Sequence, residues 1–224
     1  MSRQCIRYCA PVAARRDESQ QTDSELRERV LDALRELLRE RTFDTLSVAD
    51  IIAVAAVSRA SFYFYFPSKH AALAELVRRA VSAGHDAAQP WVRAHGSPSE
   101  TLRAGIDAGA RLWRDNAAVL RAIVENWASD PHLRELWLAQ METFTEATIA
   151  RIEADRQADP AAHARLDGVD VRALAASLTW TGERLYYLAA CGVPPFDQRE
   201  VLVDTLTHLW VSALYGRTPH DPGN

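Results

Sequence analysis

The feature that most constrains this chain is a run of five aromatic residues, Phe62–Phe66, which ends at Pro67 and lies between Ser58 and Ser68. An apolar run of this length is compatible with a buried strand or with a helix. Pro67 cannot continue a helix, and serines are favoured at helix N-termini. The pattern therefore favours a short helix from Ser58 that stops before Pro67, followed by a new helix at Ser68.

A second capped segment precedes this run. Ser47 is followed three residues later by Asp50, a spacing that resembles a capping box, and the apolar residues of 48–52 form one stripe. The small residues Ala55–Val57 allow a tight turn before Ser58. Two short helices joined by a tight turn are typical of a helix-turn-helix, whose second helix enters the DNA major groove.

The second helix of this pair offers the three kinds of position that DNA recognition needs. Val57, Phe62 and Phe66 are suited to docking it on its neighbours. Arg59 is suited to a guanine and the small Ala60 to a thymine methyl group, while hydroxyl and amine groups nearby are suited to phosphates. The residues that we expect to contact DNA are Ser47, Ser58, Arg59, Ala60, Ser61, Tyr63, Tyr65 and Lys69.

The N-terminal part divides into a tail and a helix. Residues 1–22 lack periodicity, and we expect them to form a flexible tail. Two interpretations of the tail stay open: simple disorder, or a basic arm that reaches DNA. From Ser24 to Arg41 leucines and valine recur every three or four residues, which predicts an amphipathic helix capped by Ser24. Cys5 and Cys9 lie in the tail, where we expect no metal or redox role.

The rest of the chain shows helical periodicity only. The expected helices are 68–81, Pro98–Arg114, Ala117–Ala128, Pro131 through Ile152, Val171–Ala190 and Phe196–Tyr215. Residues 157–169 form a polar linker, and Gly216 is expected to end the last helix. The predicted fold class is all-α, with a three-helix helix-turn-helix domain over 23–69 and a helical bundle over 70–224.

Composition narrows the class of protein. The chain has 224 residues, a net charge of -4 and 48% apolar residues, enough for a buried core but not typical of a general polyanion binder. Residues 1–70 carry 11 basic and 10 acidic side chains and the remainder 15 and 20, a mild asymmetry that permits DNA contact at the N-terminal end. Three cysteines argue against a disulfide framework and favour a cytoplasmic protein. The sequence shows no signal peptide and no apolar run that suits a membrane.

The segment Val57–Leu73, VSRASFYFYFPSKHAAL, resembles the helix-turn-helix signature of TetR-family regulators. That signature is apolar-Ser-x-x-x-aromatic-Tyr-x-Tyr/His-Phe-x-Ser/Asn-Lys-x-x-Leu. Ala56 stands where the family commonly has glycine, and His70 where an acidic residue is usual. More narrowly, the segments Phe62–Lys69 and Leu206–Gly216 and the pair Glu183-Arg184 are similar to the branch of the mycobacterial ethionamide-resistance repressor.

The resemblance implies a function. Proteins of this family bind palindromic double-stranded operators as homodimers and repress transcription. A small apolar or amphipathic ligand in the C-terminal domain moves the two DNA-binding heads apart and lowers operator affinity. On this basis we expect a ligand-responsive repressor, which is not an enzyme and uses no cofactor.

Aromatic residues concentrate in the C-terminal helices, where ordinary core packing and a ligand cavity are both compatible with the pattern. The resemblance favours an elongated cavity, in which Thr179 and Gly182 stand where the branch has polar residues; Gly182 has no side chain for that contact. We expect Glu183 and Arg184 to form a structural ion pair. The expected ligand contacts are Leu102, Ile106, Trp113, Trp127, Trp137, Met141, Phe144, Thr179, Gly182, Tyr186, Tyr187 and Trp210.

The last two helices carry more than one apolar stripe, so each must be covered on two sides. A four-helix bundle between two subunits meets this requirement, and a monomer with both helices internal is the alternative. The expected dimer interface comprises Leu174, Leu178, Leu185, Leu202, Leu206, Leu209 and Ala213.

Two other function classes were weighed. A helical enzyme needs a catalytic carboxylate or histidine pair, and the chain shows no phosphate-binding loop, no nucleophile motif and no metal-ligand spacing among its seven histidines. A scaffold module without DNA binding requires Tyr63 and Tyr65 to be packed inside. We therefore expect no catalytic residue and no metal site.

Overall fold

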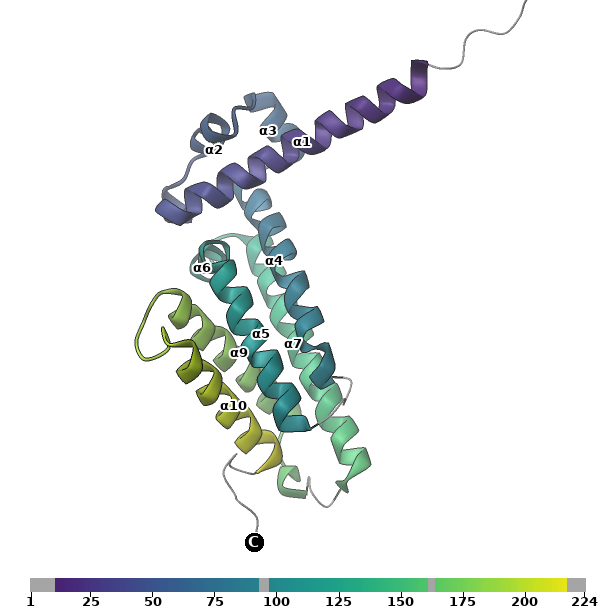
Figure 1. Cartoon of the computed structure of the whole chain (residues 1–224), viewed down its shortest axis with the longest axis vertical. Coiled ribbons are helices and arrows are strands. Elements are labelled where there is room, and N and C mark those ends of the chain that lie inside the picture. Colours follow the sequence, from purple (N-terminus) through teal and green to yellow (C-terminus); the bar gives the residue numbers. More distant parts are fainter. Residues whose placement is uncertain (1–10, 93–96, 161–163, 217–224) are drawn as a thin grey trace, which may run out of the picture. The chain divides into compact units, whose positions relative to one another are not determined.

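The computed structural model describes residues 11–92, 97–160 and 164–216, and within these ranges every regular element is a helix (Figure 1). This confirms the predicted all-α class. The elements are α1 (Pro11–Glu40), η1 (Phe43–Thr45), α2 (Val48–Ala55), α3 (Arg59–Tyr65), α4 (Lys69–Val92), α5 (Pro98–Asp115), α6 (Ala117–Asn126), α7 (Pro131–Ala158), η2 (Ala164–Leu166), α9 (Val171–Ala190) and α10 (Arg199–Tyr215).

The first helix begins earlier than predicted. α1 starts at Pro11, so Ser24 lies inside the helix and does not cap it, and most of the predicted tail 1–22 is helical. The prediction relied on apolar periodicity, which 11–23 lack. These residues are nevertheless rich in Ala, Arg, Glu and Gln, which favour helix through intrinsic propensity alone. Cys5 and Cys9 lie outside the described residues.

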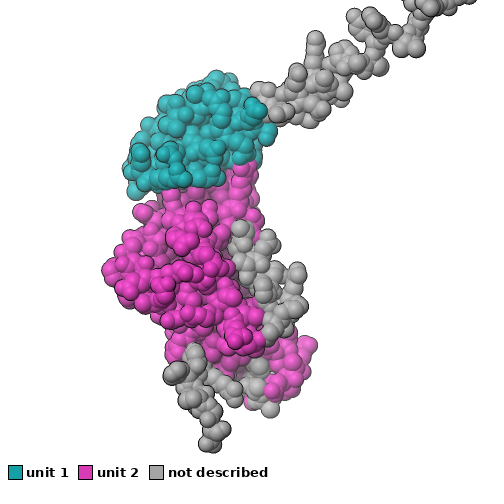
Figure 2. Space-filling model, in the orientation of Figure 1, with its two compact units in different colours: residues 1–72 teal, residues 73–224 magenta. Residues whose placement is uncertain are grey.

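The chain divides into two compact units, Met1–Ala72 and Leu73–Asn224, which Figure 2 shows in different colours. The division falls inside α4, close to the boundary at 69 and 70 expected from the sequence. In the first unit Leu31, Leu34, Phe43, Ile51 and Phe62 are almost completely buried. One face of α1 therefore packs with the apolar faces of α2 and α3, which are too short to be stable alone.

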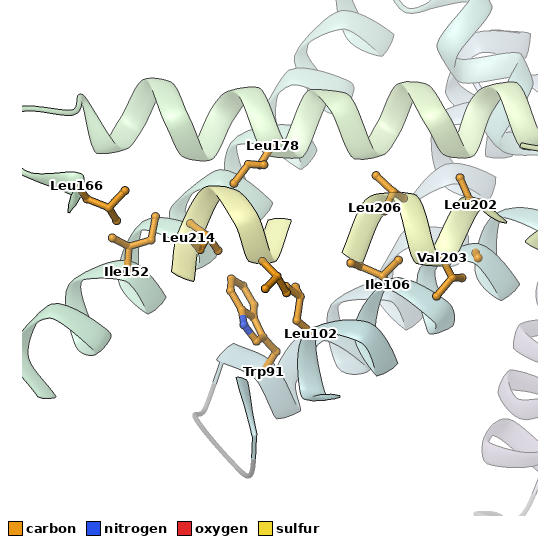
Figure 3. Close-up of a cluster of buried hydrophobic side chains, with 12 residues drawn as sticks. Trp91, Leu102, Ile106, Ile152, Leu166, Leu178, Leu202, Val203, Leu206 and Leu214 are labelled. Carbon is orange, nitrogen blue, oxygen red and sulfur yellow. The ribbon is translucent and has the colours of Figure 1, made fainter. Parts of the chain in front are cut away.

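The second unit is a bundle of α5, α6, α7, α9 and α10 with most of α4. A cluster of buried side chains from α5, α9 and α10 is closed at one end by Trp91 of α4, Ile152 of α7 and Leu166 of η2 (Figure 3). Trp91 also meets Trp210 edge to face, with ring centroids 5.7 Å apart. The apolar periodicity of these helices thus produces a buried cluster to which several helices contribute.

Helix ends follow the sequence signals closely. Asp130 accepts a hydrogen bond from the Leu133 amide and stands before Pro131, the first residue of α7. Gly216 ends α10 in the left-handed conformation with φ 66°. Local caps therefore fix where these helices begin and end.

A buried ion pair joins three helices of the second unit. Arg151 of α7, whose side chain is 4% exposed, pairs with Asp155 at 2.8 Å and donates to the main-chain oxygen of Trp91 at 2.7 Å. The Tyr215 hydroxyl of α10 donates to the same carboxylate at 3.0 Å. The sequence analysis did not anticipate this network, because its members are 60 residues apart along the chain.

Arg151→Ala is expected to lower the free energy of unfolding by about 3–5 kcal/mol, because it leaves the Asp155 carboxylate nearly buried without its cation. The double variant Arg151→Met/Asp155→Leu removes both charges and is expected to recover at least half of that loss. Urea unfolding of the three proteins measures both effects. A double variant as unstable as Arg151→Ala would contradict this account of the pair.

Candidate functional site

The first unit contains a helix-turn-helix with both helices capped. α2 and α3 form an angle of 106°, which is typical of the motif. The Ser47 hydroxyl and the Asp50 carboxylate cap α2 reciprocally, and hydrogen bonds from Ser47 hold the pKa of Asp50 at about 2. The Ser58 hydroxyl accepts from the Ser61 amide at 2.9 Å and so caps α3. Both caps were predicted from the sequence.

The turn between the two helices depends on Ala56. This residue is the C-cap of α2 and adopts the left-handed conformation with φ 50°, the only positive φ of a non-glycine residue in the part of the chain described. Such a conformation costs an alanine about 1 kcal/mol more than a glycine. Arg29 of α1 donates to the Ala56 carbonyl at 2.8 Å and helps to hold the turn.

The N-terminal half of α3 faces solvent. Ser58, Arg59 and Ala60 are exposed, Ser61 is half-buried, and the Arg59 guanidinium lies over the Tyr63 ring at 5.5 Å from its centroid. Tyr63 is 44% exposed. Phe62 and Phe66 are buried, which agrees with the docking role predicted for them. Side chains suited to base edges and phosphates thus lie on one accessible surface.

Three aromatic neighbours differ in exposure. Tyr63 is exposed and Tyr65 is half-buried, whereas Phe64 is 75% exposed, which the sequence analysis did not anticipate. The Phe64 and Tyr65 rings meet edge to face with centroids 5.0 Å apart. The exposure of Tyr63 is the opposite of what the scaffold alternative requires.

Lys69 is held inside the unit. Its ammonium group donates to the main-chain oxygens of Phe43 at 3.0 Å, Asp44 at 3.3 Å and Leu46 at 2.6 Å, and lies over the Phe43 ring. Burial of the ammonium lowers the pKa of Lys69. An ammonium has three donors, so Lys69 is placed to fix the connection between α1 and α2. A phosphate contact by Lys69, expected from the sequence, stays a prediction.

The second unit contains a cavity of about 170 Å³ lined by residues of α4, α5, α6, α7, α9 and α10. Its walls are mostly apolar and aromatic. Ten of the twelve expected ligand residues line it: Leu102, Ile106, Trp113, Trp137, Met141, Phe144, Thr179, Gly182, Tyr186 and Trp210. Trp91, Gln140, Thr148 and Glu183 also line it and were not among the expected residues.

Trp127 and Tyr187 do not line the cavity, which corrects two of the expected contacts. The Trp127 ring lies 6.4 Å from that of Trp180, and the Tyr187 hydroxyl donates to Glu125 at 3.1 Å. Both contacts join α6 to α9. Tyr187 follows Tyr186 directly, and successive helical residues point about 100° apart, so the two tyrosines face different neighbours.

One face of α9 supplies several polar groups of the cavity, beside those of α7. Thr179 is four residues before Glu183, and Tyr186 is three residues after it, so the three share one face of the helix. The Tyr186 hydroxyl donates to the Ile106 carbonyl at 2.9 Å. Among the described residues, the Thr179 hydroxyl, the Trp137 indole nitrogen and the Glu183 Oε1 have no hydrogen-bond partner, although all three are buried.

Gly109 of α5 makes the position of Tyr186 possible. A Cβ atom at Gly109 would lie 2.7 Å from the Tyr186 hydroxyl oxygen, closer than real Cβ contacts. At Gly182 the nearest atom to such a Cβ would be a Tyr186 ring carbon at 3.9 Å, an ordinary contact. A glycine inside a helix lowers stability by about 1 kcal/mol relative to alanine. The close approach of Tyr186 explains why α5 has a glycine at position 109.

Gly109→Ala is therefore expected to be less stable than Gly182→Ala by about 2 kcal/mol. The first variant displaces Tyr186 and breaks its buried hydrogen bond, while the second gains helix propensity without a clash. Thermal unfolding of the two variants and the wild type gives the comparison. Equal stability of the two variants would show that Tyr186 is free to move.

Glu183 forms the expected ion pair with Arg184, but the contact is long and only one of its carboxylate oxygens takes part. Its side chain is 3% exposed, and the nearest cation is the Arg184 guanidinium, with Nε 3.9 Å from Oε2. Arg184 is itself mostly exposed and lies over the Tyr187 ring at 5.0 Å. Burial raises the pKa of Glu183, and Arg184 opposes this only in part. One feature of the sequence could have indicated this position: Glu183 is the single acidic residue in the mostly apolar α9.

Glu183→Gln is expected to raise the free energy of unfolding at pH 7 by about 1–2 kcal/mol, because the folded protein no longer buries a carboxylate that has one oxygen without a hydrogen bond. The folded pKa of Glu183 is raised, so the wild type recovers stability as the pH falls through that value. The advantage of the variant is then largest at neutral pH and disappears below the pKa of the unfolded chain. Unfolding at pH 7 and pH 4 tests this, with the exposed Glu153→Gln as control. A variant less stable than wild type at pH 7 would refute it.

The predicted dimer residues fall into two groups. Leu178, Leu202 and Leu206 belong to the core of their own chain, so we remove them from the expected interface. Leu209 is 40% exposed, and Leu174, Leu185 and Ala213 are half-buried. These four leave apolar surface on α9 and α10 that the chain does not cover itself.

The described residues contain no group of three or more His, Cys, Asp or Glu side chains arranged to hold a metal ion. No single helix among the described residues is long and apolar enough to cross a membrane. The bent pair α2–α3 would be long and apolar enough when its two helices are taken together, by length and composition only.

Comparison with known proteins agrees with these features. Residues 30–76 match the family "Bacterial regulatory proteins, tetR family", and residues 102–216 match "Transcriptional regulator EthR, C-terminal domain". The chain is similar to the HTH-type transcriptional regulator EthR of Mycolicibacterium smegmatis, with 33% identity over 193 residues, which cover 85% of this chain and 86% of the relative.

Solved structures show the same fold. A TetR-family regulator from Syntrophomonas wolfei superposes with a TM-score of 0.69 at 16% identity, over 88% of this chain and 99% of the other. The repressor FadR of Thermus thermophilus, in complex with lauroyl-CoA, superposes with a TM-score of 0.59 at 20% identity, over 88% of this chain and 100% of the other.

Proposed function

The chain belongs to the TetR family of bacterial transcriptional regulators and to its EthR branch, and from that premise we propose that it is a homodimeric repressor released from a palindromic operator by a small apolar or amphipathic ligand. Its relatives are DNA-binding regulators, not enzymes. Because it is proposed to bind DNA in a bacterial cell, the protein is proposed to act in the cytoplasm.

The observation that carries DNA binding is the capped α3 with its exposed N-terminal half. A recognition helix presents its first residues to base edges. Arg59 is the one basic residue on α3 and is proposed to read guanine, while Ala60 and Ser61 fit closely against the groove floor. Tyr63 and Tyr65 are proposed to hold phosphates through their hydroxyl groups.

Ser47 and Ser58 have a double role in this proposal. Their hydroxyl groups are already engaged in the caps of α2 and α3. The proposed contacts to phosphate therefore come from the helix N-termini that they stabilise. Lys69, whose three donors face carbonyl groups, is proposed to act mainly by fixing α2 against α1.

The cavity in the second unit supports a ligand-binding role. Its mostly apolar walls with a few polar groups are typical of small-molecule sites. The relative FadR is in complex with lauroyl-CoA, an amphipathic molecule. For release, the ligand must bind the dimer conformation of low operator affinity more tightly than the DNA-competent one, a coupling of typically about 1–3 kcal/mol.

We propose that α9 and α10 form the dimer interface. Leu209 is exposed, and Leu174, Leu185 and Ala213 are only half-buried in the single chain. Pairing these two helices with their copies covers that apolar surface in an isologous four-helix arrangement. Two-fold symmetry of the protein then matches a palindromic operator.

Arg59→Ala is expected to weaken binding to the operator by about 10- to 100-fold and to relax the base preference at one position of each half-site, because a bidentate contact to guanine is lost. Tyr63→Phe is expected to weaken binding to all sequences equally. Gel-shift titrations of DNA upstream of the gene, with competitor DNA at near-physiological salt, measure both effects.

The matched control is Arg39→Ala, which removes the same charge from an exposed arginine of α1 outside the motif. Unchanged operator affinity in both Arg59→Ala and Tyr63→Phe would contradict the proposed interface. If the upstream fragment does not shift, selection from random DNA decides whether the operator lies elsewhere. Selection of no sequence would refute the DNA-binding proposal.

A further inference from the structure

The polar groups of the cavity divide into those with internal partners and those without. Tyr186 donates to the Ile106 carbonyl at 2.9 Å, and Thr148 donates to the Phe144 carbonyl at 3.0 Å. The Thr179 hydroxyl and the Glu183 Oε1 have no hydrogen-bond partner in the described part of the chain. Both lie on the same face of α9, four residues apart.

The state of Thr179 is unusual for a threonine of this protein. Thr145, Thr148 and Thr207 are also buried in helices, and each donates to the carbonyl four residues before it, at 2.7 to 3.0 Å. Thr179 makes no such bond, although it is only 7% exposed. Its hydroxyl is therefore available to a group in the cavity.

The two carboxylate oxygens of Glu183 differ in their contacts. Oε2 lies 3.9 Å from Nε of Arg184, whose side chain is mostly exposed. Oε1 is buried and has no hydrogen-bond partner in the described part of the chain, and Glu183 is one of the residues that line the cavity. A buried carboxylate oxygen without a hydrogen bond is costly, so Glu183 offers an acceptor that a cationic donor in the cavity would satisfy.

The walls of the cavity suit a positive charge. Among the described residues that line it, Glu183 is the only acidic one, and none is Lys, Arg or His. Trp113, Trp137, Tyr186 and Trp210 contribute aromatic rings to the same walls, and Trp113 and Tyr186 stack with centroids 6.1 Å apart. Aromatic faces attract cations, most strongly where water is excluded.

We propose that the inducer of this protein carries a protonated amine on a small apolar body, and that Glu183 receives the amine with Thr179 as the second acceptor. This rests on the ligand-responsive function proposed above and names the chemical class of the ligand. A cavity of about 170 Å³ has room for a benzene-sized group with a short extension, since an engineered cavity of about 150 Å³ binds benzene.

The pKa of Glu183 agrees with this assignment. Burial raises the pKa of Glu183, and the Arg184 guanidinium opposes this shift only in part. An ammonium group within hydrogen-bond distance stabilises the ionised form. Amine and carboxylate then form a charge-assisted pair in surroundings where such pairs are strong.

The test uses the full chain and three probes of similar size: 2-phenylethylamine, its uncharged counterpart 2-phenylethanol, and 2-phenylacetamide, which carries a carbonyl acceptor. Binding is measured without DNA, by isothermal titration calorimetry and by the fluorescence of the cavity tryptophans. The proteins are wild type, Glu183→Gln, and Glu153→Gln as a control that removes the same charge on the surface.

The expected result is that wild type and Glu153→Gln bind 2-phenylethylamine at least tenfold more tightly than 2-phenylethanol. Glu183→Gln is expected to lose this preference while it keeps its affinity for 2-phenylethanol. Three results would overturn the proposal: no binding of the amine, equal affinity of amine and alcohol in wild type, or tighter binding of the amide, which would make Glu183 a neutral donor.

The outcome is separable from that of the repressor proposal. If the amine binds through Glu183 but does not change operator affinity in a gel shift, the inference on ligand class holds and ligand-induced release fails. If neutral molecules release the operator while the amine does not bind, the repressor proposal holds and the role of Glu183 is refuted.

Discussion

The second unit depends on the burial of α9, which packs against α5, α6, α7 and α10 at once. The side chains of α9 that face these neighbours are divided among them, while Arg172, Ser177 and Arg184 stay exposed. Leu178 joins the hydrophobic core, Trp180 and Tyr187 meet α6, and the face with Thr179 and Glu183 borders the cavity. Core, cavity and candidate interface are therefore set by one helix.

This arrangement explains why the cavity has unpaired polar atoms. The side of a helix that packs against apolar neighbours is most stable when its residues are apolar. Glu183 is an exception, because it is a charged residue at a position that is 5% exposed. Arg151, the other charged residue buried in the described part of the unit, is bonded to Asp155 and to the Trp91 carbonyl. The contrast within one small bundle suggests that Glu183 serves a partner that is not part of the chain.

Local signals in the sequence predicted the elements well. The caps Ser47, Ser58 and Asp130 and the terminal Gly216 act within four residues of themselves, so a linear pattern contains them. These caps set the bounds of the short helices, and the fold of the first unit follows when the apolar faces of α1, α2 and α3 pack together. The capped α3 that we propose to read DNA could therefore be predicted from the sequence, but the exposure of Phe64 could not, because it depends on where α3 docks.

Contacts between distant residues were not accessible in this way. Lys69 has the pattern of a phosphate ligand, and only the fold shows three carbonyls around its ammonium group. Glu183 beside Arg184 has the sequence pattern of a surface ion pair, and only the fold shows that Glu183 lies on the buried side of α9. In each case the charge of the residue was evident, but its partner is set by packing. A buried carboxylate in the wall of a cavity gives a cationic ligand a specific contact, and that contact controls a switch only where the two conformations of the dimer present it differently.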